Sequence, residues 1–190
     1  MPTFTPSLEV KELLDPDAIL QQEFEYARET SLQANNDRTQ IVNLYVILVG
    51  GVGSLALGLP ALSAENGQAP SLLLGIICLL LGVLGLFNVL KLIRLRQAWH
   101  DSAKAMNQIK DFYMAHYPNI APAFRWRTET IPAPGKMGTI TFDLVVLVAV
   151  IDSLALGGGL FFLGLPLWAA ALAALVFFGA QWALYFRLLK

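Results

Sequence analysis

The sequence predicts an all-α integral membrane protein with four transmembrane helices, of which the first two extend into the cytoplasm as a long antiparallel helical hairpin. Of its 190 residues, 56% are hydrophobic and 14% are charged, whereas roughly 25% of the residues in an average soluble domain are charged. Four apolar segments also reach the ~20 residues that an α-helix needs to cross a bilayer. They are 41–62, 71–93, 140–162 and 167–189.

The basic residues predict the orientation of these spans. The 13 Lys and Arg residues lie in the N-terminal part, at the end of the second span, in the central loop or at the C-terminus. Neither short loop, 63–70 or 163–166, contains one. Loops without Lys and Arg face away from the cytoplasm. We therefore expect a multi-pass protein of the cell membrane with cytoplasmic N- and C-termini.

The first span is expected to continue a cytoplasmic helix. Residues 1–15 form a predicted tail that ends at Asp15, which would cap a helix with Pro16 at its first position. Residues 16–40 would then run directly into the span. One face of this extension carries side chains at alternating spacings of four and three, which is typical of helix packing. They are Leu20, Phe24, Ala27, Ser31 and Ala34.

A second cytoplasmic helix, 94–117, is expected to continue the second span until Pro118 ends it. Its stripe is more apolar and has the same spacing. The stripe comprises Leu92, Leu95, Trp99, Ser102, Met106, Ile109 and Tyr113. Because the two long helices have similar lengths, we expect their stripes to pack together as in a coiled coil.

Two helices are too few to cover this stripe and the aromatic residues around it, including Phe112 and Tyr117. We therefore expect self-association into a homo-oligomer, or a cytoplasmic protein partner, to supply further cover. The expected oligomer or partner face comprises Leu95, Trp99, Met106, Ile109 and Tyr113.

The segment 118–138 is rich in Pro and Gly and predicts an extended connector back to the third span. Within it, aromatic and basic side chains alternate at Phe124, Arg125, Trp126 and Arg127. Arg125, Trp126 and Arg127 are candidate contacts for lipid headgroups. The favoured alternative is that Phe124 and Trp126 dock onto the hairpin.

Asp152 is the most informative polar residue, because its place in the third span is ~18 Å along the helix axis and close to mid-bilayer. It has two candidate roles: a proton- or ion-binding carboxylate, or a hydrogen-bond partner in helix packing. Asn88 and Gln181 complete the predicted interhelical polar site. Both are expected nearer the cytoplasmic end than Asp152, so no relay through all three is expected.

Glycines in the spans predict close helix approach. For 157–159, a local helix break near Asp152 is the weaker alternative.

The sequence contains no pattern typical of an active site or a cofactor site. Cys78 has no partner for an intrachain disulfide, and His100 and His116 are too far apart to bind one metal. The net charge of −1 argues against nucleic acid as a ligand. We therefore expect no cofactor and no metal. The predicted function is a non-enzymatic, homo-oligomeric structural or interaction assembly with a cytoplasmic helical collar. The alternative is an oligomeric ion or proton channel, or a pore-forming effector, that uses Asp152.

Overall fold

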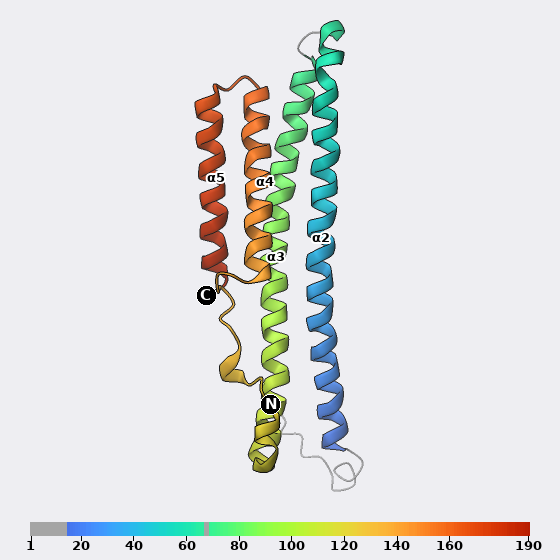
Figure 1. Cartoon of the computed structure of the whole chain (residues 1–190), viewed down its shortest axis with the longest axis vertical. Helices are drawn as coiled ribbons and strands as arrows, with labels where there is room; N and C mark the ends of the chain where they lie inside the picture. The colour runs from blue at the N-terminus through green and yellow to red at the C-terminus, as the bar shows by residue number, and fades with distance from the viewer. Residues whose placement is uncertain (1–14, 67–68) are drawn as a thin grey trace, which may run out of the picture. The chain divides into compact units, whose positions relative to one another are not determined.

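The computed structural model describes residues 15–66 and 69–190, with side chains at 15–58 and 71–190 (Figure 1). Four α-helices dominate this part of the chain: α2 (Pro16–Asn66), α3 (Ala69–His116), α4 (Ile140–Phe162) and α5 (Leu167–Leu188). No strand occurs within these described ranges. Each of the four helices is long and apolar enough to cross a membrane. The prediction of an all-α fold with four long apolar helices is thus confirmed.

The helix ends follow local sequence signals. The backbone N–H of Asp17 donates a hydrogen bond of 3.0 Å to Oδ1 of Asp15, so the predicted cap of α2 is confirmed. Thr139 caps α4 by accepting a hydrogen bond of 3.3 Å from the backbone N–H of Phe142. The turn between α4 and α5 contains Gly164 at φ +97°, a conformation that favours glycine.

The connector before α4 is more folded than predicted. It contains two short 3₁₀-helices, η1 (Pro118–Ala123) and η2 (Thr128–Thr130). Pro118 at the first position of η1 has a ring that fixes φ near the helical value, so this segment can turn without forming a longer helix.

The chain divides into two compact units. The first contains the chain up to Gln33 together with Trp99–Ile131, and we call it unit 1. The second, unit 2, contains Ala34–Ala98 and Pro132–Lys190. α2 and α3 each supply residues to both units.

Unit 1 buries mainly small and polar side chains. Ala27 and Ser31 of α2 are buried, while Leu20 and Phe24 are half-buried, so the predicted face of this segment coincides with its least exposed positions. The hydroxyl of Tyr113 donates a hydrogen bond of 2.9 Å to Oδ1 of Asp17. This bond raises the pKa of Tyr113, because the ionised phenol would lose it.

Unit 2 has a larger apolar core to which all four helices contribute. Its buried residues are Val42, Tyr45, Val89, Leu92, Ile93, Val145, Val148, Ala149, Tyr185 and Leu189. α4 and α5 lie side by side and antiparallel (Figure 1). Large hydrophobic side chains also point outward from this unit, among them Leu57, which is 85% exposed.

The glycines of the spans behave in two ways. α4 runs without interruption through 157–159, so the alternative of a helix break there is wrong. Gly157 instead allows α4 to approach α5, because an added Cβ would lie 3.0 Å from Cβ of Ala174. Around Gly50, Gly51, Gly53 and Gly58 of α2, no described atom comes within 4 Å of such a Cβ, so the expected close approach is absent there.

Candidate functional site

Asp152 lies at the centre of unit 2 and has no exposed surface. Its Oδ1 accepts hydrogen bonds from Nε2 of Gln181 at 2.9 Å and from Oγ of Ser153 at 3.3 Å. Gln181 is also fully buried. The bond from Gln181 crosses from α5 to α4, so the amide group reaches the carboxyl group of Asp152, although the sequence predicts Gln181 nearer the cytoplasmic end of its span.

α2 and α3 also contribute residues to the surroundings of Asp152. A Cβ added to Gly85 of α3 would lie 2.2 Å from Cβ of Asp152 and 2.6 Å from the hydroxyl oxygen of Tyr45. That hydroxyl, which comes from α2, donates a hydrogen bond of 3.2 Å to the carbonyl of Leu81. Gly85 therefore leaves the space that the carboxyl group and the phenol occupy. The close approach at Gly85 agrees with the use expected of glycines in the spans. The sequence analysis missed Tyr45 and Ser153, although a tyrosine hydroxyl within an apolar span is itself a signal of a buried polar contact.

Two oxygen atoms of this cluster could accept hydrogen bonds but have no donor among the described residues. Oδ2 of Asp152 and Oε1 of Gln181 are buried and have no hydrogen-bond partner among the described residues. Buried acceptors without donors are costly. A proton on the carboxyl group, a cation or a water molecule would satisfy them. Asn88 is half-buried and donates neither of the hydrogen bonds that Oδ1 of Asp152 accepts, so the structure groups two of the three predicted polar residues.

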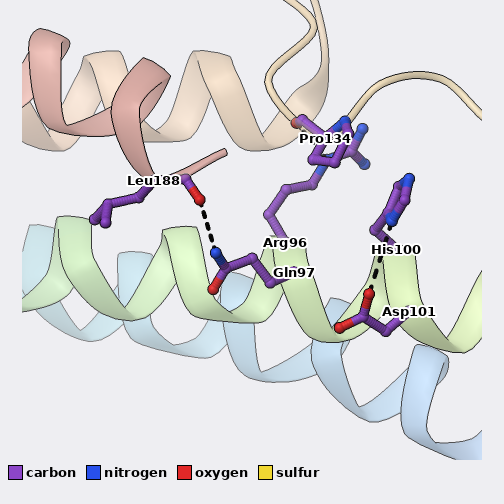
Figure 2. Close-up of polar contacts among 6 residues, drawn as sticks. All are labelled: Arg96, Gln97, His100, Asp101, Pro134 and Leu188. Atoms are coloured by element: carbon purple, nitrogen blue, oxygen red, sulfur yellow. Dashed lines mark hydrogen bonds and ion pairs between the residues drawn. The ribbon is translucent and has the colours of Figure 1, made fainter. Parts of the chain in front are cut away.

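A second polar cluster lies at the ends of the helices of unit 2. Nη1 of Arg38 donates a short hydrogen bond to Oγ1 of Thr141 in the first turn of α4. Nε of Arg96 donates to the carbonyl of Pro134 at 3.1 Å. Nearby, Nε2 of Gln97 reaches the carbonyl of Leu188 at 2.8 Å (Figure 2). These contacts hold the beginning of α4 and the end of α5 beside α2 and α3.

Unit 1 contains a surface groove of about 360 Å³. Its lining is mostly apolar, with charged side chains at Asp17 and Lys110. The remaining lining residues are Leu20, Gln21, Phe24, Ile109, Tyr113 and Phe124. Nζ of Lys110 lies 6.0 Å from the ring centroid of Phe24.

The residues of the predicted oligomer or partner face are only partly exposed in the structure. Trp99, Met106, Ile109 and Tyr113 are half-buried within unit 1, and Leu95 is half-buried within unit 2. The more exposed aromatic side chains of unit 1 lie elsewhere. Phe112 is 48%, Tyr117 61% and Trp126 66% exposed.

The aromatic and basic residues of the connector also differ in their contacts: some pack within unit 1 and others are exposed. Phe124 lines the groove, so its predicted docking within the chain is observed. Trp126 does not dock, and the guanidinium of Arg125 lies 5.9 Å from its ring centroid. Arg127 folds the connector by donating through Nη2 to the carbonyl of Ala121 at 2.9 Å.

No group of three or more His, Cys, Asp and Glu side chains that could hold a metal ion occurs within the described residues. His100 lies 3.8 Å from the carboxylate of its neighbour Asp101 (Figure 2). Comparisons with protein-family models, with curated proteins and with solved structures found no match for this chain.

Proposed function

We propose that the chain is a non-enzymatic multi-pass protein of the cell membrane, which it crosses four times with both termini in the cytoplasm. Its outward apolar side chains support contact with lipid, since large exposed apolar surfaces are rare on soluble monomers. Charge supports the orientation, because the described basic residues of unit 2 lie near the start of α4, near the end of α5, or on α2 and α3 close in sequence to the residues that contact these two helix ends. They are Arg38, Lys91, Arg94, Arg96, Lys136, Arg187 and Lys190.

Cysteine labelling tests this orientation. With Cys78 replaced by Ser, a cysteine is introduced in the α4–α5 turn (Leu165→Cys) or in the central connector (Lys136→Cys). In intact cells a membrane-impermeant maleimide should label L165C alone, and K136C should react only after permeabilisation. Labelling of K136C from outside would reject the orientation.

For the biochemical role, we propose a homo-oligomeric structural or interaction assembly in which unit 1 forms a cytoplasmic collar that can receive a protein partner. One observation carries this proposal. Phe112, Tyr117, Ile120 and Trp126 expose large apolar side chains in the unit that would lie in water. Large exposed apolar side chains are enriched at association surfaces.

Native mass spectrometry of the detergent-solubilised chain tests the assembly. Wild type should be an oligomer, and the double variant Phe112→Asp, Trp126→Asp should shift it toward the monomer, because an oligomer would bury both carboxylates at a cost. The double variant Gln22→Asp, Gln33→Asp is the matched control, because it adds the same two negative charges at exposed polar sites of unit 1. A monomeric wild type would end the proposal.

An ion or proton channel, or a pore-forming effector, is the second candidate. The unpartnered oxygens of Asp152 and Gln181 favour it, because they are the groups that would bind a proton or a cation. In proteoliposomes Asp152→Asn should then change the flux or its dependence on pH. Absence of flux in wild type under proton, sodium and potassium gradients would eliminate this candidate.

A further inference from the structure

The two arginines at the basic end of unit 2 converge on one place. Arg38 approaches from α2 and Arg96 from α3, and both donate to the segment that leads into α4, at Thr141 and Pro134. Figure 2 shows the side chain of Arg96 extended toward Pro134. Three chain segments therefore bring two guanidinium groups together beside the start of α4.

Arg96 is buried and Arg38 is half-buried, and no described side chain forms an ion pair with Arg38. Arg96 is only 5% exposed. The side-chain partners of Arg38, Thr141 and Asn35, are neutral, and its Nε is buried with no partner among the described residues. Burial, followed by the positive charge of Arg96, lowers the pKa of Arg38. Burial likewise lowers the pKa of Arg96. A half-buried guanidinium group whose hydrogen-bond partners are neutral, and which lies near a second positive charge, would be stabilised by an anion.

The surrounding charges favour an anion as the missing group. Unit 2 has seven basic and four acidic residues, a net charge of +3, although the whole chain has −1. Asp37 and Asp143 are the acids closest in sequence to this cluster on α2 and α4, and neither forms an ion pair with Arg38 in the structure. Guanidinium groups present forked donors that match the oxygens of a phosphate.

We propose that Arg38 and Arg96 together bind the phosphate of an anionic phospholipid headgroup at the cytoplasmic end of unit 2. This inference rests on the proposed membrane insertion. The phosphate would accept from both guanidinium groups and relieve their mutual repulsion, while the acyl chains would lie along the outward apolar side chains of unit 2. Inorganic phosphate or a soluble phosphate ester shares the recognised chemistry, and the test separates these sources.

The test titrates the full-length chain in detergent with phosphatidylglycerol and, separately, with phosphatidylcholine, and counts bound lipid by native mass spectrometry. Wild type should hold phosphatidylglycerol in preference to phosphatidylcholine. Arg38→Gln and Arg96→Gln should each weaken that binding about tenfold or more, as expected for lost hydrogen bonds to a charged group. Arg38→Lys should retain part of the affinity, because lysine keeps the positive charge but lacks the two parallel N–H donors of a guanidinium group.

Arg94→Gln is the matched control, since Arg94 is an exposed cation two residues from Arg96 on the same helix. It should bind phosphatidylglycerol like wild type. Equal losses in R94Q and R38Q, or no loss in R38Q, would overturn the proposal. Because Arg38 is only half-buried, R38Q should fold, and unchanged circular dichroism must accompany its loss of binding.

Two further measurements distinguish a lipid headgroup from a soluble phosphate and test the membrane insertion on which this inference rests. Glycerol 3-phosphate and inorganic phosphate should not displace the lipid at equal concentration, and displacement would assign the site to a soluble phosphate and overturn the lipid assignment. Flotation with neutral phosphatidylcholine vesicles tests insertion itself. A chain that floats but shows no preference for phosphatidylglycerol refutes only this inference, whereas a chain that does not float refutes the proposed function as well.

Discussion

Unit 1 and unit 2 use the same two long helices but bury opposite kinds of side chain. In unit 2 the core consists mostly of Val, Leu, Ile and Tyr, and large hydrophobic residues also face outward. In unit 1 the buried positions include Ala27, Ser31, Ser102 and Asn107, and the unit has ten acidic and six basic residues, a net charge of −4. Under the proposed membrane insertion, this difference matches unit 2 to an apolar surrounding and unit 1 to an aqueous one.

The same comparison concerns stability. Unit 2 depends on a tightly fitted polar cluster at the contact of four helices, whereas unit 1 depends on small interior residues and local helix contacts. Substitutions should therefore cost more in unit 2. Hydrogen exchange followed by mass spectrometry can measure the opening free energy of each unit separately.

The largest effect is expected from Gly85→Ala. Its new methyl group would overlap Asp152 and the hydroxyl of Tyr45, so α3 must move away from its neighbours. We expect the unfolding free energy of unit 2 to fall by about 3 kcal/mol. The control is Gly53→Ala, which has no described atom within 4 Å of the added group and should be neutral or stabilising. Equal effects of the two substitutions would show that Gly85 is not required for the helix contact.

A smaller loss is expected from Gln181→Leu. This change leaves Oδ1 of Asp152 without its interhelical donor and should destabilise unit 2 by about 1 to 2 kcal/mol. Asn88→Leu is the comparison, since Asn88 is not one of the two donors to that oxygen. If both variants unfold alike in detergent, the cluster has no special role in stability.

In unit 1 the corresponding effect should be local. Asp15→Ala removes the carboxylate that caps α2 and should cost about 1 kcal/mol. The faster exchange should be confined to the first turns of α2, while the amides of unit 2 keep their wild-type rates. A spread of the effect into unit 2 would contradict the separation of the two units.

The smallest effect should come from Glu25→Gln. Oε2 of Glu25 lies 2.8 Å from Nη2 of Arg28, but both side chains are about half exposed, so solvent screens the pair. We expect a loss of at most about 0.5 kcal/mol, which should shrink further when salt is added. A loss that is larger or unaffected by salt would mean that unit 1 depends on its surface charges.

The sequence predicts the elements of this fold much better than their junctions. Long apolar segments, a capping Asp15 and faces spaced by three and four residues are local signals, and the helices follow them. The bond from Gln181 to Asp152 depends on which faces of α4 and α5 meet and on the reach of a long amide side chain, and residue counting reveals neither. Tyr45 and Gly85 belong to the cluster because of helix rotation, and a tyrosine or a glycine in an apolar segment is consistent with many other positions.

In the proposed membrane-spanning topology, the four-residue turn between α4 and α5 has a consequence for biosynthesis. α4 alone would carry Asp152 into lipid, at an insertion cost of roughly 3 kcal/mol. Because only Leu163 to Pro166 separate the two helices, α5 can emerge beside α4 and present the amide of Gln181 before the pair leaves the insertion machinery. The carboxyl group of Asp152 can then accept its hydrogen bond from Gln181 before it is exposed to lipid. The loop that must be translocated consists of four residues, none of which is charged.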